Sequence, residues 1–229
     1  MKREQIVRAL DGFYVFLERP LYLWTRPVLV LLLVPLVIGL IMPLWHIRME
    51  APQYPEGLSV DIYAHTLQGG HEGNDLREIN ILNHYIGMSK IDRSELADLD
   101  WLPFGFGLLG IMLLRLAAVG NVRSLLDLSA IVGYFTAFAL GRFVYKMYAY
   151  GHHLSADAPI KIKPFMPALF GTKEVGNFTT HAGPGSGTYL IGVFACGLFG
   201  IALLHLVQGR RRAKKSDTTA AAPATAEAS

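Results

Sequence analysis

Hydrophobic positions in this chain are gathered into four long blocks, whereas a soluble core would spread them along the sequence. The blocks cover residues 27–45, 101–119, 128–148 and 189–207. A helix of about 20 apolar residues crosses the ~30 Å hydrocarbon core of a bilayer, and each block is close to that length. The pattern therefore predicts an all-α membrane protein with four transmembrane helices.

The first block, residues 27–45, contains no charged side chain. It is too long for the core of a secretory signal peptide, and no small-residue cleavage site follows it, so we expect an uncleaved span. Pro35 has no backbone N–H to donate and should kink the helix. Before the block, residues 1–26 combine a helical stripe of Ile6, Leu10, Phe13 and Leu17 with basic residues, which predicts an amphipathic helix on the membrane surface.

Positive charge is concentrated beside the two ends of the chain. Residues 1–26 contain five Lys and Arg, and five more follow the last block between residues 210 and 215. The positive-inside rule places both ends in the cytoplasm, so the long polar loops 46–100 and 149–188 face the periplasm of a bacterial inner membrane. This topology explains the net charge of +3 without a nucleic-acid partner. The Ala- and Thr-rich segment 208–229 cannot bury a core and should be disordered.

The first loop contains two ordered patterns. Residues 58–64 alternate between apolar and polar side chains, which is typical of a strand. Asp75 and Glu78 have the spacing of a helix capping box, and apolar residues at helical spacing follow until Gly87. We therefore expect both loops to fold together into one small cap of mixed structure, organised around the helix that begins near Asp75.

The polar side of that helix provides candidate metal ligands. Asn80, Asn83 and His84 lie on it, and Met88 follows just past its end. Asn80, His84 and Met88 would align if the helix continued through Gly87. Imidazole and thioether groups suit Cu(I), and His152 of the second loop could complete a site with His84 and Met88. The alternative is that His84 is a hydrogen-bonded surface residue and Met88 packs on a neighbour.

Other residues narrow the chemistry. Cys196 is the single cysteine, so an intrachain disulfide and covalently attached haem are excluded. No Ser/His/Asp set, phosphate-binding loop or dinucleotide motif is present, which argues against an enzyme. Arg142 lies inside the third span and is a candidate functional residue, with attachment to lipid head groups as the alternative.

Small residues recur every four positions in the third and fourth spans, at Gly133, Ala137 and Gly141 and at Gly192, Cys196 and Gly200. Such spacing allows helices to approach closely in lipid. It predicts that these two spans pack against each other. The alternative is that the same small residues form the interface of a homodimer.

Three runs of sequence resemble one known family. They are Pro43–Gly57, Asn80–Met88 and Tyr150–Lys161, the last continuing to Pro164–Gly171. Together they look like a family of small bacterial membrane proteins associated with gene clusters for nitrous oxide reductase maturation, alongside copper-delivery and ABC-transport accessory proteins. The resemblance covers most of residues 40–195, and His84, Met88 and His152 fall at positions that match its pattern.

The resemblance implies a place in this maturation pathway. Together with the residues, it favours a non-enzymatic inner-membrane accessory protein that assists assembly or copper loading of a periplasmic metalloenzyme, such as nitrous oxide reductase. Its expected partners are the lipid bilayer and either that metalloenzyme or other membrane accessory proteins. Two alternatives remain. The first is a structural subunit of a membrane electron-transfer complex with no metal of its own, and the second is a permease component.

Overall fold

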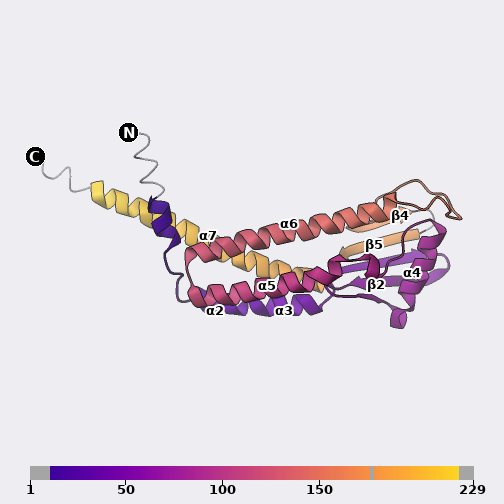
Figure 1. Ribbon diagram of the computed structural model, residues 1–229, viewed down its shortest axis with the longest axis horizontal. Coiled ribbons are helices and arrows are strands. Elements are labelled where there is room, and N and C mark those ends of the chain that lie inside the picture. The colour runs from indigo at the N-terminus through magenta and orange to yellow at the C-terminus, as the bar shows by residue number, and fades with distance from the viewer. Residues whose placement is uncertain (1–10, 176–177, 222–229) are drawn as a thin grey trace, which may run out of the picture.

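The computed structural model describes residues 11–175 and 178–221 of the 229-residue chain. It is elongated, with a helical stem at one end and a cap at the other (Figure 1). The stem consists of α2 (Thr25–Leu31), α3 (Leu33–Ile41), α5 (Asp98–Val119), α6 (Val122–His152) and α7 (Ser186–Ala221). The cap consists of α4 (Asn74–Tyr85), two short 3₁₀ turns (His71–Gly73 and Arg93–Glu95) and the strands β1 (Trp45–Ala51), β2 (Tyr54–Ile62), β3 (Leu67–Gly69), β4 (Gly171–Val175) and β5 (Phe178–Pro184).

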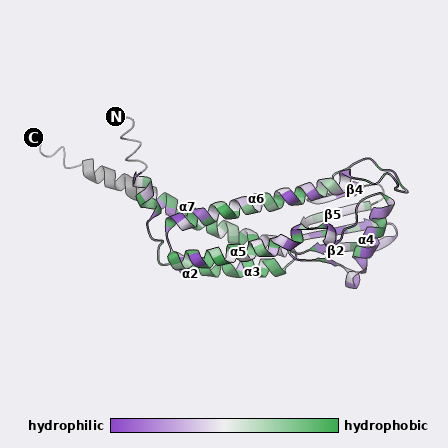
Figure 2. Ribbon diagram, viewed as in Figure 1, coloured by the Kyte–Doolittle hydropathy of each residue, from purple (hydrophilic) through white to green (hydrophobic). Residues whose placement is uncertain are grey.

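Three stem helices are long and apolar enough to cross a membrane, namely α5, α6 and the Ser186–Gly209 part of α7. Large apolar side chains on their outer surfaces remain exposed, as Phe104 and Tyr134 do. Hydrophobic residues dominate the stem, whereas hydrophilic residues gather in the cap (Figure 2). This distribution fits a membrane protein whose stem lies in the bilayer.

The first apolar block differs from the single span expected over residues 27–45. It forms two short helices, α2 and α3, separated at Leu32, and the second ends at Ile41. Pro35 lacks the N–H that would bond to the carbonyl of Leu31, and the residue before Pro43 is extended because a proline disfavours helical backbone there. Within the described ranges, three helices rather than four meet the criteria of length and apolarity, so the four-span count is not confirmed.

The remaining spans are found, with longer helices than expected. α5 begins at Asp98, and α6 extends beyond both predicted ends, to Val122 and His152. Gly120 at φ +62° and Asn121, whose side chain accepts a hydrogen bond from the Ser124 amide, form the tight turn that makes α5 and α6 antiparallel. α7 continues as a helix to Ala221, past the predicted end of the fourth span at residue 207.

The cap is built on a five-stranded antiparallel sheet in the order β3-β2-β1-β5-β4. Three strands come from the first polar loop and two from the second, and β1 joins them by pairing with β5 from Trp45↔Pro184 to Glu50↔Thr179. The all-α class is therefore not confirmed, although both loops contribute to one cap. Alternation predicted the centre of β2, where Leu58 and Val60 are buried.

The two faces of the sheet differ in polarity. Trp45, Ile47 and Met49 of β1 face the stem, while the intervening residues of the same strand, among them His46 and Arg48, face the opposite side. The apolar face therefore meets the end of the helical stem, and the polar face is directed away from it.

The closest helix contact in the stem is between α3 and α7, not between α6 and α7 as the small-residue spacing predicts. A Cβ atom added at Gly39 would lie 2.9 Å from Ile191 Cγ1, and one added at Gly187 would lie 2.6 Å from the Gly39 carbonyl oxygen. By contrast, a Cβ at Gly141 or Gly192 would meet nothing within 4 Å. The predicted interface is wrong at these two positions because no neighbouring helix comes within 4 Å of either added Cβ.

The stem end far from the sheet is closed by the amino-terminal segment. Residues 1–10 of the predicted amphipathic helix lie outside the described residues, and 11–17 are helical. Leu21 N–H donates to the Gly120 carbonyl at 2.6 Å, and Tyr22 N–H donates to Nε2 of the buried His205 at 3.3 Å. The segment is thus tied both to the α5–α6 turn and to α7.

Candidate functional site

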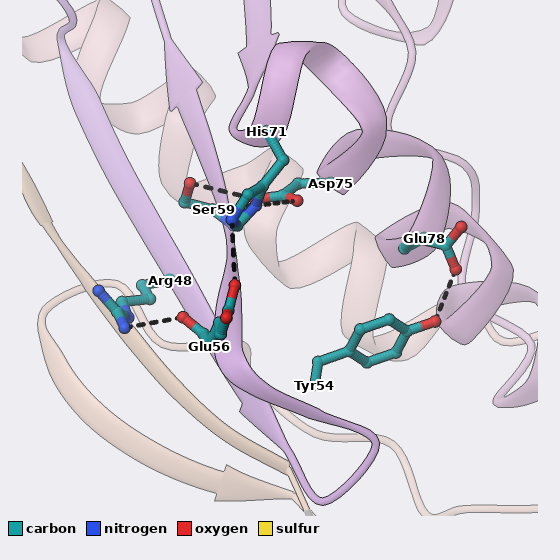
Figure 3. Close-up of polar contacts among 7 residues, drawn as sticks. All are labelled: Arg48, Tyr54, Glu56, Ser59, His71, Asp75 and Glu78. Carbon is teal, nitrogen blue, oxygen red and sulfur yellow. Dashed lines mark hydrogen bonds and ion pairs between the residues drawn. The ribbon is translucent and has the colours of Figure 1, made fainter.

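Helix α4 is fixed to strand β2 by a buried carboxylate (Figure 3). Asp75 is 2% exposed, and its Oδ2 accepts a hydrogen bond from the Ser59 amide at 2.8 Å. Its Oδ1 lies 2.7 Å from Nδ1 of His71. The predicted capping box is wrong, because the helix begins at Asn74 with Gly73 at φ +93° as its cap and without a side-chain cap.

A second carboxylate attaches the same helix to the same strand. Glu78 accepts a hydrogen bond from the Tyr54 hydroxyl at 2.6 Å (Figure 3). This bond, helped by burial and by the negative charge of Glu78, raises the pKa of Tyr54. Both members of the expected capping box therefore serve tertiary contacts, which local spacing could not reveal.

His71 lies in a strained turn that sequence reasoning did not single out. Its φ is +47° and that of Glu72 is +59°, values that L residues rarely adopt. Nε2 of His71 lies 3.8 Å from a carboxylate oxygen of Glu56. A carboxylate–histidine pair can orient a metal ligand, but no group of three or more His, Cys, Asp or Glu within the described ranges could hold a metal ion. We therefore assign the Asp75–His71 pair to holding the turn against β2.

The side chain of Asn80 holds the segment that follows α4. Its Nδ2 donates to the Ile91 carbonyl at 3.0 Å, and its Oδ1 accepts from the Ile91 amide at 2.7 Å. The helix ends at Tyr85, and Gly87 has φ +78°, so the continued helix that would align Asn80, His84 and Met88 does not form. The side chain of Asn80 therefore fixes the loop to α4 at Ile91.

The three predicted metal ligands have different surroundings. His84 is exposed and lies beside the ring of Tyr85. Met88 is partly buried against a cluster that contains Leu96, Leu99 and Tyr150. His152 Nδ1 lies 3.0 Å from the Tyr148 carbonyl oxygen, and the two rings stack with centroids 3.8 Å apart.

Hydrogen bonds hold the segments that carry these ligands together. The Ser155 amide donates to the Gly87 carbonyl at 2.8 Å, and the Ile160 amide donates to the Tyr85 carbonyl at 2.9 Å. The Tyr150 hydroxyl donates to the Lys90 carbonyl at 3.2 Å. Residues 150–160, at the start of the second loop, are thus hydrogen-bonded to residues 85–90 of the first loop. The ligand set itself stays a prediction.

Arg142 contacts the protein instead of extending toward head groups. Its guanidinium donates to both carboxylate oxygens of Asp98, at 3.0 and 3.2 Å. The indole of Trp101 donates to the same carboxylate at 2.9 Å, and the ammonium of Lys146 donates to the Glu95 carbonyl at 2.6 Å. This cluster lies where the stem meets the cap.

Beside the cluster is an apolar cavity of about 400 Å³. Its walls come from the apolar face of the sheet and from α5, α6 and α7. Asn83, 2% exposed, and Trp45, 6% exposed, are among its lining residues, and their side-chain N–H groups have no hydrogen-bond partner within the described residues. Asn83 was a predicted candidate because it lies beside His84 on the helix. Nothing local in the sequence indicated the cavity.

No protein-family model, curated protein or solved structure matches this chain. The site must therefore be interpreted from its own residues.

Proposed function

We propose that this chain is a non-enzymatic accessory protein of the bacterial inner membrane, with its cap in the periplasm. Its role is to assist assembly or copper loading of a periplasmic metalloenzyme, such as nitrous oxide reductase. The observation that carries the proposal is the attachment of the second loop to residues 85–90, since it brings together the segments that contain His84, Met88 and His152.

The distribution of charge supports this orientation. The carboxyl-terminal part of α7 and the helical stretch 11–17 lie at the stem end away from the sheet (Figure 1). Arg19 and Arg26 follow the stretch 11–17 in the chain, and the basic run 210–215 belongs to α7. Cations beside a span resist translocation, so this end belongs in the cytoplasm and the sheet on the other side.

The chemistry of the three side chains supports copper as the cargo. Neutral imidazole and thioether are soft or borderline donors that suit Cu(I), and a three-ligand set leaves a position open for passing the ion onward. Since Nδ1 of His152 bonds to Tyr148, Nε2 is its available ligand atom. Met88 would have to turn out of its contacts with Leu96 and Leu99 to bind.

One observation favours the competing function, a structural subunit of an electron-transfer complex without its own metal. Two of the three predicted ligands already have protein neighbours, namely Met88 in an apolar cluster and His152 against Tyr148. A subunit of this kind would co-purify with a cytochrome or an oxidase and would contain no copper.

Copper titration of the purified protein under reducing conditions separates the two. The variants are His84→Ala, Met88→Ala and His152→Ala, with the exposed neighbour His153→Ala as a matched control. We expect each of the first three to weaken Cu(I) binding by at least about tenfold, and the control to behave as wild type. Binding should also weaken in mildly acidic buffer, because only neutral imidazole ligates. Equal binding by all four variants, or no binding by wild type, would replace copper loading with the structural function.

A further inference from the structure

The cavity between cap and stem has the lining of a site for a hydrocarbon chain. Trp45, Ile47 and Met49 cover it from the sheet, and Leu102, Phe106 and Phe135 line it from the stem. Its volume of about 400 Å³ lies within the range of ligand pockets. Since α5 and α6 are apolar enough to lie in a bilayer, lipid is the solvent that adjoins this part of the molecule.

The helices around the cavity do not fill it. Ala139 on α6 and Gly192 and Ala195 on α7 line it with small side chains, and a Cβ at Gly192 would meet nothing within 4 Å. Apolar wall atoms that no side chain contacts lose packing interactions. Water is a poor occupant, because each buried water molecule needs two to four polar partners. An apolar occupant from the surrounding bilayer would restore these interactions.

Two residues of the wall carry unpaired polar atoms. Asn83 Nδ2 and Trp45 Nε1 are buried N–H donors, and neither has an acceptor within the part of the chain that the structure describes. Buried donors are normally paired, since an unpaired one loses its hydration without compensation. Both donors are enclosed by protein atoms, so they do not define the polar contacts of an occupant.

The charged residues of the wall favour an anionic ligand. Arg142, Lys146 and Lys173 line the cavity together with one carboxylate, that of Asp98. Arg142 and Asp98 neutralise each other, and the ammonium of Lys146 bonds to a carbonyl rather than to a carboxylate. A neutral isoprenoid quinone would offer carbonyl groups but no negative charge for Lys146 and Lys173.

We propose that the cavity binds an acyl chain of an anionic membrane amphiphile, with its acidic group beside Lys146. This inference does not depend on copper binding. An acidic phospholipid and a free fatty acid share the required chemistry, and the experiment distinguishes them.

The test uses tryptophan fluorescence and lipids with brominated chains. The chain has three tryptophans, and Trp45 and Trp101 both line the cavity. Trp24→Phe therefore leaves only cavity tryptophans to be quenched. Full-length protein in detergent is titrated with brominated phosphatidylglycerol, brominated oleic acid or brominated phosphatidylethanolamine, and with ubiquinone as an unbrominated competitor.

We expect saturable quenching by phosphatidylglycerol or by the fatty acid at concentrations where phosphatidylethanolamine has little effect, and ubiquinone should not compete. The acid that binds more tightly identifies the source. Gly192→Leu should weaken binding by at least about tenfold, because the new side chain replaces several methylene groups of the ligand. The control Gly141→Leu, equally open but absent from the cavity wall, should bind as wild type.

Ala139→Leu changes a second wall position and is tested in case Gly192→Leu does not fold. Thermal unfolding identifies which samples are folded. Lys146→Gln should reduce the preference for acidic over neutral lipid. Undiminished quenching in folded Gly192→Leu and Ala139→Leu, or equal binding of phosphatidylethanolamine or ubiquinone, would overturn the proposal.

Discussion

Asp98, in the first turn of α5, accepts two hydrogen bonds from the guanidinium of Arg142, which lies 44 residues further along the chain in α6. The pair joins the two helices at the cap end of the stem, while the Gly120–Asn121 turn joins them at the other end. The side chain of Asp98 is 15% exposed and that of Arg142 is 37% exposed. This pairing therefore fixes the distance between α5 and α6 beside the cavity.

Removing one member of this pair should destabilise the protein more than removing both. Arg142→Met leaves a largely buried carboxylate with only the Trp101 indole as a donor, and Asp98→Asn leaves a cation without its counter-charge. We expect each to cost about 1–3 kcal/mol, between the values typical of exposed and of buried pairs. The double variant should cost less than the sum of the two. Thermal unfolding in detergent measures all three, and additive losses would mean that the two charges do not interact.

The glycine contacts predict which stem positions tolerate a larger side chain. Gly39→Leu and Gly187→Leu should lower the yield of folded protein, because each places a side chain against backbone or Ile191 at 3.0 Å or less. Gly141→Leu is the matched control and should fold as wild type, since nothing lies within 4 Å of its Cβ. Yield and monodispersity in detergent provide the measurement. A stable Gly39→Leu protein would show that α3 and α7 are not closely packed.

The buried carboxylate of Asp75 should contribute to the stability of the cap. Asp75→Ala removes the acceptor of the Ser59 amide and of His71, and we expect a loss of about 1–3 kcal/mol. Asp61→Ala is the control, because Asp61 pairs with the exposed His46 and should contribute about 1 kcal/mol or less. Limited proteolysis of the cap and thermal unfolding would detect the difference. Equal effects of the two substitutions would contradict the anchoring role of Asp75.

Reporter fusions test the orientation of the molecule. A reporter active only in the periplasm should work at Gly70 and Gly171, both in the cap, and fail at Asn121 and Ser216. The reason is the cationic character of the segments next to the latter two positions, which resists translocation. Activity at Ser216 would place the carboxyl terminus outside and change the number of crossings.

The sequence predicts those features that depend on local composition or on short periods. Long apolar runs identified α5, α6 and α7, and alternation identified the centre of β2 around Leu58 and Val60. The interruption of the first block at Leu32 was expected from Pro35, but the early end at Ile41 was not, because Pro43 was included in the span.

The features that the sequence did not predict depend on contacts between distant residues. β5 needs β1 as a partner and β4 needs β5, and neither strand shows a long alternating pattern of its own. Gly39 has prolines, not small residues, four positions away on either side, so small-residue spacing did not indicate it. The same spacing did indicate Gly141 and Gly192, where no helix packs closely. The Asp98–Arg142 pair and the cavity arise only once α5, α6 and the sheet are in place.

The pairing of β1 with β5 sets the order in which the cap can be completed during synthesis. β1, β2 and β3 leave the ribosome early, but the edge of β1 has no partner until residues 178–184 have been made and brought to the same side. An unpaired strand edge is a template for pairing with other chains. A nascent chain halted after α6 therefore exposes an aggregation-prone edge, and only the arrival of the segment just before α7 closes it.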